Sequence, residues 1–201
     1  MALEVAKQRQ PIIEPTMNTR TEPASSPTPG PSAEPQAAPA RGAWLLGALA
    51  ALTTWAAFFP LDWGFLGWVC LVPLILLVRV PAVTRWMYLA LYVTAAAGTI
   101  ASLQWMRLGD TWMIPAWLAL ASYLALYVPL FVGLSRIAVH RLHCPLGLAV
   151  PVVWVGLEFA RSHIMTGFAW YFLGHSQYGW TELIQVSDLV GAYGVSFVIA
   201  L

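Results

Sequence analysis

Apolar runs about as long as a membrane-spanning helix follow one another from Ala43 to the end of the chain. A helix needs about 20 consecutive apolar residues to cross a bilayer. The runs cover residues 43–61, 64–78, 86–106, 112–134, 145–160 and 183–201. Prolines inside them, such as Pro73 and Pro151, are compatible with membrane helices because neighbouring groups satisfy the freed carbonyls. The pattern predicts an all-α membrane protein, a helical bundle of about six transmembrane segments.

Charged residues are too scarce to cover a soluble globule. They make up 9% of the chain, hydrophobic residues make up 59%, and the mean hydropathy is +0.69. Average soluble domains carry about 25% charged residues. The formal net charge of +1 provides no basic face, so nucleic acid is excluded as a partner.

The first 40 residues differ in composition from the rest of the chain. They contain the segment TEPASSPTPGPSAEPQAAPA, rich in Pro, Ala and Ser, with no aromatic ring and no apolar period. We predict a disordered cytoplasmic tail at 1–40 and a transmembrane domain at 43–201. No apolar core directly follows a basic start, so the tail does not resemble a secretory signal peptide. A long tail and a start codon assigned too far upstream are both compatible with it.

Basic residues are distributed unequally between the two sides that the predicted spans define. Those on the side of the N-terminus are Lys7, Arg9, Arg20, Arg41, Arg79, Arg85, Arg136 and Arg141. The other side holds only Arg107 and Arg161. The positive-inside rule therefore predicts a multi-pass membrane protein with a cytoplasmic N-terminus. The last apolar run stops at Leu201 without a polar flank, and from this we expect a chain truncated within its last span.

Polarity gathers in one stretch, LEFARSHIMTGFAWYFLGHSQYGW at 157–180, which the charge bias places at the outer face. Glu158 and Arg161 are three residues apart, so on a helix they share a face and can pair. Charge inside a membrane marks a functional site by default, although an interfacial salt bridge that ends a helix is the simpler alternative. Rings such as Phe168 and Trp170 form either an interfacial belt or a slot for an acyl chain or a lipid headgroup.

Signals for metal or nucleotide chemistry are missing from the sequence. His163 and His175 have no third ligand at metal-site spacing, and Cys70 and Cys144 fit neither a disulfide framework nor a metal motif. No nucleophile elbow, P-loop or glycine-rich dinucleotide turn occurs. We therefore expect no metal, no cofactor and no catalytic residue in this chain.

Two blocks of sequence carry a resemblance to a known family. The first is E-x-x-R-x-x-x-x-T-G-F-x-W, which runs from Glu158 to Trp170 and is followed by Gly174, Ser176 and Gln177. The second is D-x-x-G-x-Y-G-V-S-F, which begins at Asp188. Together with the order of the apolar runs, residues 43–201 resemble the N-terminal membrane domain of bacterial apolipoprotein N-acyltransferase. One departure is Ala169, where the family usually has proline.

The resemblance implies a function in lipoprotein maturation. The family transfers an acyl chain from a phospholipid to the N-terminal diacylglyceryl-cysteine of a lipoprotein, at the outer face of the inner membrane. Its Glu-Lys-Cys triad, which forms a thioester intermediate, lies in a nitrilase-like domain after the spans, and neither cysteine of this chain takes that place. We therefore expect the chain alone to be inactive. The residues expected at the entrance for the acyl chain are Glu158, Arg161, Phe168, Trp170, His175 and Gln177.

Two other functions remain open. A non-catalytic membrane module that binds lipids or a partner protein fits the same aromatic loop. A small transporter using Glu158, Arg161 and the histidines as a relay fits less well, because transporter sites lie near the bilayer midplane.

Overall fold

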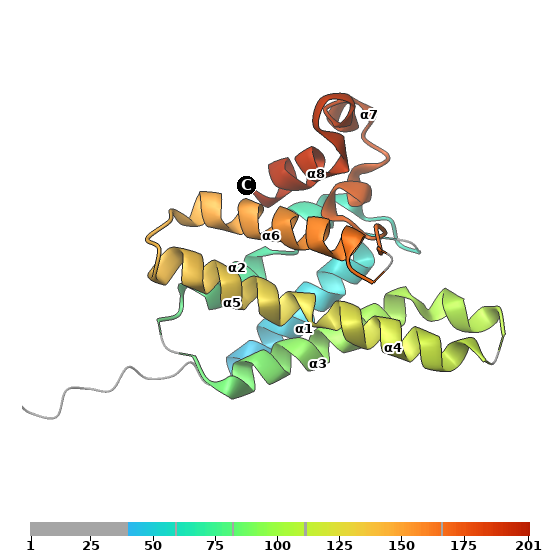
Figure 1. Cartoon of the computed structure of the whole chain (residues 1–201), viewed down its shortest axis with the longest axis horizontal. Helices are drawn as coiled ribbons and strands as arrows, with labels where there is room; N and C mark the ends of the chain where they lie inside the picture. Colours follow the sequence, from blue (N-terminus) through green and yellow to red (C-terminus); the bar gives the residue numbers. More distant parts are fainter. Residues whose placement is uncertain (1–39, 59, 82, 111, 166) are drawn as a thin grey trace, which may run out of the picture. The chain divides into compact units, whose positions relative to one another are not determined.

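The computed structural model describes residues 40–58, 60–81, 83–110, 112–165 and 167–201. All of these residues belong to one of the chain's two units, residues 35–201. The predicted tail at 1–40 lies outside the described residues except for Ala40. Every regular element in the described residues is a helix (Figure 1). The prediction of an all-α protein is therefore confirmed.

Eight α-helices and three short 3₁₀ helices follow one another in the described part of the chain. The α-helices are α1 (Ala40–Ala56), α2 (Val72–Arg79), α3 (Arg85–Ser102), α4 (Met113–Ala125), α5 (Tyr127–His140), α6 (Leu146–His163), α7 (Thr181–Ile184) and α8 (Ser187–Ala200). The 3₁₀ helices are η1 (Gly64–Trp68), η2 (Gln104–Leu108) and η3 (Leu173–Gln177).

One helix in the described residues is long and apolar enough to cross a membrane. It is the 28-residue stretch Met113–His140, in which Leu126 keeps helical torsion angles (φ −63, ψ −26) between α4 and α5. The apolar helices α1 and α8 are shorter, with 17 and 14 residues. The apolar runs thus became helices, while the number of helices that cross a bilayer stays a prediction.

Two of the predicted spans are not single straight helices. The run at 64–78 divides into η1 and the eight-residue α2, whose first turn contains Pro73. The run at 183–201 divides into α7 and α8, and Gly191 inside α8 has a left-handed φ of 67. Glycine tolerates this angle at little cost, so the chain bends there.

Helix α6 brings the polar stretch to one end of the bundle. It begins after Pro145, whose backbone is extended (ψ 139), and ends at His163, before Ile164, which is also extended (ψ 142). Pro151 inside α6 is buried and lacks an N–H, so it removes one hydrogen bond from the helix. Because the helix nevertheless continues to His163, Glu158 and Arg161 lie in its last two turns.

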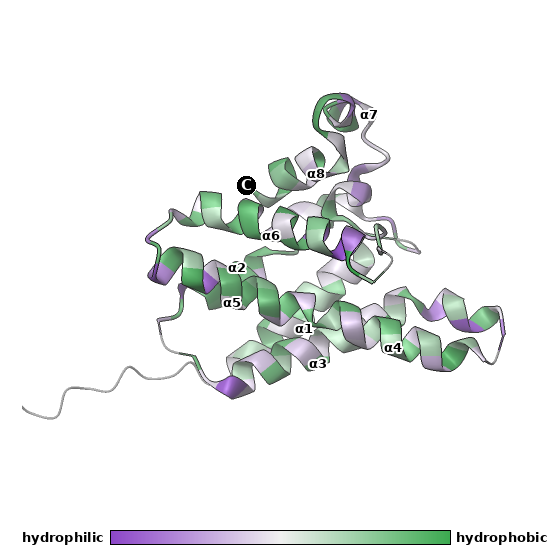
Figure 2. Ribbon diagram, in the orientation of Figure 1, coloured by the Kyte–Doolittle hydropathy of each residue, from purple (hydrophilic) through white to green (hydrophobic). Residues whose placement is uncertain are grey.

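The α-helices pack mainly against partners that are near them in the sequence, either adjacent α-helices or α-helices separated by one short α-helix. Helix α1 packs on α3, α3 on α4, α5 on α6, and α6 on α8, and η1 contacts η3 (Figure 1). The main core centres on the fully buried Phe131, Met87 and Leu91. Large apolar side chains also face outward, including Leu45 and Leu52, which are 73% and 60% exposed. Polar residues lie mostly at helix ends and in connections (Figure 2), a distribution that suits a lipid surrounding.

Candidate functional site

Glu158 connects the last turns of α6 to the start of η3. Its side chain is 3% exposed. Its Oε1 accepts hydrogen bonds from Trp154 Nε1 at 2.9 Å and from the backbone N–H of Leu173 at 2.7 Å. The second oxygen, Oε2, is enclosed without a hydrogen-bond partner among the described residues. Glu158 therefore fixes the position of η3 on α6.

Arg161 binds the loop that precedes η3. Its Nη2 donates to the carbonyls of Trp170 and Tyr171, at 3.1 and 3.2 Å. Its guanidinium carbon lies 5.2 Å from the centre of the Phe172 ring, within the range of a cation–π interaction. Among the described side chains, Arg161 and Glu158 form no direct ion pair, although their spacing allows one. Both instead tie the loop to α6.

The loop has a defined backbone path between α6 and η3. Gly167 has a φ of 85, and a Cβ at this position would collide with the carbonyl oxygen of Ser162. This turn allows the N–H of Phe168 to reach the carbonyl of Arg161 at 2.9 Å. Tyr171, with a φ of 57, donates its hydroxyl to the carbonyl of Ser102 at 3.1 Å. The loop is thus attached both to α6 and to the end of α3.

An apolar cavity of about 120 Å³ lies inside the bundle, beside this loop. Its walls come from α1, α3, α4, α5 and α6, and Arg161, Phe168 and Tyr171 line it at the loop. Two of the six predicted site residues, Arg161 and Phe168, therefore line one cavity. A guanidinium beside an apolar space can bind the oxygen atoms of an ester or a phosphate while the apolar walls contact a hydrocarbon chain.

The other predicted residues lie around this cavity or are buried in the structure. Trp170 is 57% exposed, and its ring centre is 5.6 Å from that of Trp105. His175 is exposed and its ring centre is 5.1 Å from that of Phe172. Gln177 is fully buried and does not line the cavity. The structure thus brings Arg161, Phe168 and Trp170 together, places His175 on the Phe172 ring that Arg161 also contacts, and buries Gln177 away from the cavity.

Gln177 joins two distant segments. Its Nε2 donates to the carbonyl of Gly64 at 2.7 Å, and its Oε1 accepts from Trp68 Nε1 at 3.2 Å. Both partners belong to η1, so this amide holds η1 and η3 together. Gln177 therefore stabilises the position of η3 by binding η1 and does not contact the cavity.

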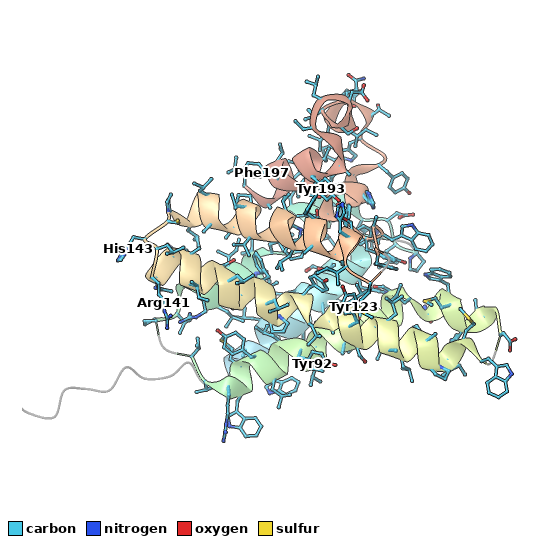
Figure 3. The ribbon with its side chains drawn as sticks, viewed as in Figure 1. Tyr92, Tyr123, Arg141, His143, Tyr193 and Phe197 are labelled. Atoms are coloured by element: carbon cyan, nitrogen blue, oxygen red, sulfur yellow. The ribbon has the colours of Figure 1, made fainter. Side chains whose placement is uncertain are left out.

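Helix α8 supports the same loop from another side. Tyr193, which lies between α8 and α6 in Figure 3, shares a hydrogen bond of 2.6 Å with Ser162 Oγ. Its ring centre is 5.3 Å from that of Phe172. The N–H of Gly174 donates to Ser196 Oγ at 2.9 Å. The two sequence blocks, 158–177 and 188–197, therefore meet in space.

The electrostatics of the loop centre on Arg161. Partial burial, followed by the positive charge of Arg161, lowers the pKa of His175 below its ordinary value of 6.5. His175 is therefore mostly neutral at pH 7. Among the described residues, no group of three or more His, Cys, Asp or Glu side chains is arranged to hold a metal ion.

Several cavity residues were not singled out from the sequence. Tyr171 belongs to the ring-rich stretch and was recognisable by its neighbours. Trp55, Tyr127 and Trp154 also line the cavity, but each lies within an apolar run where an aromatic residue gives no functional signal. Only the packing of α1, α5 and α6 brings them together.

Comparisons with known proteins identify the family of this chain. The family of the apolipoprotein N-acyltransferase N-terminal domain matches residues 50–201. The apolipoprotein N-acyltransferase of Rhodopirellula baltica is 37% identical over 168 residues, which cover 78% of this chain and 29% of that protein. The one from Chromobacterium violaceum is 32% identical over 166 residues, covering 78% and 32%. The one from Geobacter metallireducens is 38% identical over 118 residues, covering 55% and 22%.

The chain thus spans about a third or less of the length of these curated relatives. The family match extends over most of the chain and includes the loop and all the described cavity residues except Gly47. The chain belongs to the apolipoprotein N-acyltransferase family, in which it corresponds to the N-terminal domain.

Proposed function

We propose that the chain forms the membrane part of an apolipoprotein N-acyltransferase of the bacterial inner membrane. The proposed reaction transfers an acyl chain from a phospholipid to the N-terminal diacylglyceryl-cysteine of a lipoprotein. The observation that carries the proposal is the apolar cavity lined by Arg161 and Phe168 at the loop after α6. Membership of the family supports the reaction, and the cavity supports a role in binding the donor.

The cavity and its arginine suit an amphiphilic ligand. Hydrocarbon contacts the apolar walls, and Arg161 offers its guanidinium to ester or phosphate oxygens, since a charged donor forms the stronger hydrogen bonds. The volume of about 120 Å³ is below the range of about 300–1,000 Å³ for small-molecule pockets. The cavity therefore accepts one end of an acyl chain, and the rest of the phospholipid lies outside it.

The predicted site residues then have different roles. Arg161 and Phe168 contact the lipid, and Trp170 with Trp105 forms a ring pair at the rim, where tryptophan suits a membrane interface. Glu158 and Gln177 are positioning residues that hold η3 and the loop through the hydrogen bonds given above. His175 lies beside Phe172 and is given no direct contact with the lipid. None of these side chains is assigned the nucleophile or base of the acyl transfer.

The predicted orientation would suit such a role. With the N-terminus in the cytoplasm, α6 runs outward and the loop lies at the outer interface. The substrate lipid and the lipoprotein's modified cysteine would both be available there.

A chimaeric enzyme tests the proposal without requiring the 201-residue chain to act alone. Residues 50–201 replace the matching region of the Rhodopirellula baltica relative, and the chimaera is expressed in bacteria depleted of their own N-acyltransferase. We expect the mass of lipoprotein N-terminal peptides to increase by one acyl group. Arg161→Gln and Trp170→Ala should each reduce this product at least about tenfold, as expected for about 1.4 kcal/mol of lost transition-state binding.

Arg141→Gln is the matched control, because Arg141 is exposed and lies at the opposite end of the bundle (Figure 3). It should leave acylation unchanged. Full acylation by both loop variants would refute the role of the loop. A chimaera that inserts into the membrane and retains phospholipid, but never acylates, would favour a non-catalytic lipid-binding module.

A further inference from the structure

A second apolar cavity, of about 380 Å³, lies between α1 and α3. On α1 it is lined by Ala48, Ala51 and Leu52, and on α3 by Ala97, Gly98 and Ala101. Leu52 and Ala97 are exposed, so the cavity is a groove that opens to the surroundings of the bundle. Its volume falls within the range of about 300–1,000 Å³ that is usual for ligand pockets.

The groove exists because small residues line both helices. A Cβ on Gly47 would press on the side chain of Thr94, and a Cβ on Gly98 would lie 3.1 Å from the Cβ of Ala51. The backbones of α1 and α3 are therefore close together, and little side-chain volume is left to fill the space beside them.

The groove and the inner cavity run along two faces of the same helix. Gly47, Ala50 and Thr54 of α1 line the inner cavity, whereas Ala48 and Leu52 line the groove. The two volumes therefore cover the same stretch of α1, which extends about 10 Å between residues 48 and 55 at 1.5 Å per residue. The groove and the inner cavity are therefore two apolar spaces that lie side by side at the same level along α1.

Trp55 is the largest side chain that the two spaces share. Among the described residues, Ala51, Trp55 and Gly98 line both the groove and the inner cavity. Alanine and glycine have too little side chain to separate the two spaces. The indole Nε1 of Trp55 is enclosed and has no hydrogen-bond partner among the described residues. A buried N–H without an acceptor costs free energy, so a ligand oxygen between the two spaces would be stabilised by the indole.

We propose that one phospholipid places one acyl chain along the groove and part of the other in the inner cavity, with Trp55 between them. A phospholipid has two hydrocarbon tails that leave one glycerol, and each joins it through an ester carbonyl. Trp55 precedes Ala56, the last residue of α1. The predicted orientation places this end of α1 at the outer side of the membrane. The glycerol esters of a phospholipid lie at that level. The indole N–H donates to an ester carbonyl, and Arg161 at the inner cavity faces the polar part of the lipid. This proposal rests on the proposed function and specifies a two-chain donor.

Photo-crosslinking tests the occupant directly. The 201-residue chain is reconstituted in phosphatidylethanolamine vesicles that contain a trace of phosphatidylethanolamine with a diazirine at the end of one acyl chain. After illumination, we expect labelled peptides from both spaces, the segments around Ala97–Ala101 and around Leu124–Val128. The one-chain lyso form of the probe should label both segments several-fold less.

Two variants separate specific binding from general contact with lipid. Ala97→Leu fills the groove and should lower labelling of the α3 segment several-fold. Ala119→Leu makes the same change at an exposed alanine of α4 that lines neither space, and it should have no effect. Trp55→Phe keeps the ring and removes the N–H, so it should reduce the preference for the two-chain probe over the one-chain probe.

Equal labelling of Ala97→Leu and Ala119→Leu would overturn the proposal, as would labelling of the groove alone. A defined dimer that Ala97→Leu dissociates would also overturn it, because a second copy of the chain would then occupy the groove. The readout does not depend on acyl transfer. An inactive chimaera with intact two-site labelling would refute the proposed function and leave the two-chain site standing.

Discussion

Two arginines lie at opposite ends of the described bundle and are used differently. Arg136 on α5 donates to the backbone carbonyls at the end of α2, and the acceptors are Leu77, Val78, Val80 and Pro81. The last carbonyls of a helix have no partner within the helix, and a cationic side chain satisfies them well. Arg136 is therefore occupied by structural hydrogen bonds.

Arg161 on α6 is less fully occupied. One nitrogen, Nη2, donates to the loop carbonyls of Trp170 and Tyr171, while Nε has no partner among the described residues. Arg161 also lines the inner cavity, and Arg136 does not. The fold thus uses the hydrogen-bonding capacity of Arg136 and leaves part of that of Arg161 free beside the cavity, which is the basis for proposing Arg161 as a ligand contact.

The largest stability effect should come from Arg136. Arg136→Ala leaves several carbonyls at the end of α2 without a donor, and we expect a loss of about 3 kcal/mol, as for hydrogen bonds to a charged group. Thermal unfolding of the detergent-purified chain measures this as a lower Tm. The control is Arg141→Ala, at an exposed position directly after α5, and it should change the Tm little. A larger decrease in Tm for Arg161→Ala than for Arg136→Ala would contradict the view that Arg136 is the arginine on which the fold depends more.

The next effect concerns the residue that holds η3 beside Arg161. Glu158→Ala removes the acceptor of two donors, Trp154 Nε1 and the N–H of Leu173, and at about 1 kcal/mol for each unpaired donor the loss should be smaller than for Arg136→Ala. Glu158→Gln keeps a carbonyl oxygen for both donors and should be close to the parent protein in Tm. If both variants unfold at the same reduced temperature, the negative charge rather than the acceptor geometry holds η3.

A smaller loss is expected at the turn of the loop. Gly167→Ala places a side chain at a φ of 85 and against the carbonyl of Ser162, which should cost more than about 1 kcal/mol. The matched control is Gly147→Ala, where a Cβ meets nothing within 4 Å. Limited proteolysis of both variants in vesicles measures the opening of the loop. Equal cleavage would mean that the backbone angle does not constrain the loop.

The sequence predicted helices well because long apolar runs favour helical structure even where they contain Pro151 or Gly191. It placed the end of one run at Leu134, since Ser135 and Arg136 are polar, but α5 continues to His140. Ser135 is fully buried and Arg136 is satisfied by α2. A polar residue ends a predicted span even where the helix continues, because tertiary contacts such as those of Arg136 with α2 are not visible in local sequence.

The candidate site was predictable in part for the same reason. Arg161 and Phe168 stood out because charge and rings gather in one short stretch. Gln177 looked like a binding residue from the same stretch, yet its partner Trp68 is 109 residues away and the amide is buried between them. Trp55 is the reverse case, an aromatic residue that an apolar run conceals and that packing brings to both cavities.

The smallest effect should be a change of titration beside Arg161. Because burial and the charge of Arg161 lower the pKa of His175, the unfolded chain binds more protons between that lowered pKa and the ordinary value of 6.5. Stability contributed by neutral His175 is therefore present above pH 6.5 and declines as the pH falls through the lowered pKa. The effect is small because the exposed side chain of His175 is screened by solvent.

Arg161→Gln removes the nearby positive charge and should move the pKa of His175 toward 6.5, as followed by NMR of the imidazole ring in lipid nanodiscs. Arg107→Gln removes an exposed charge on η2 and should leave it unchanged. A pKa that responds equally to both changes would mean that net charge, and not the position of Arg161, controls the loop. Arg161 would then act on the loop only through its hydrogen bonds, as Arg136 acts on α2, and the contrast between the two arginines would rest on the cavity alone.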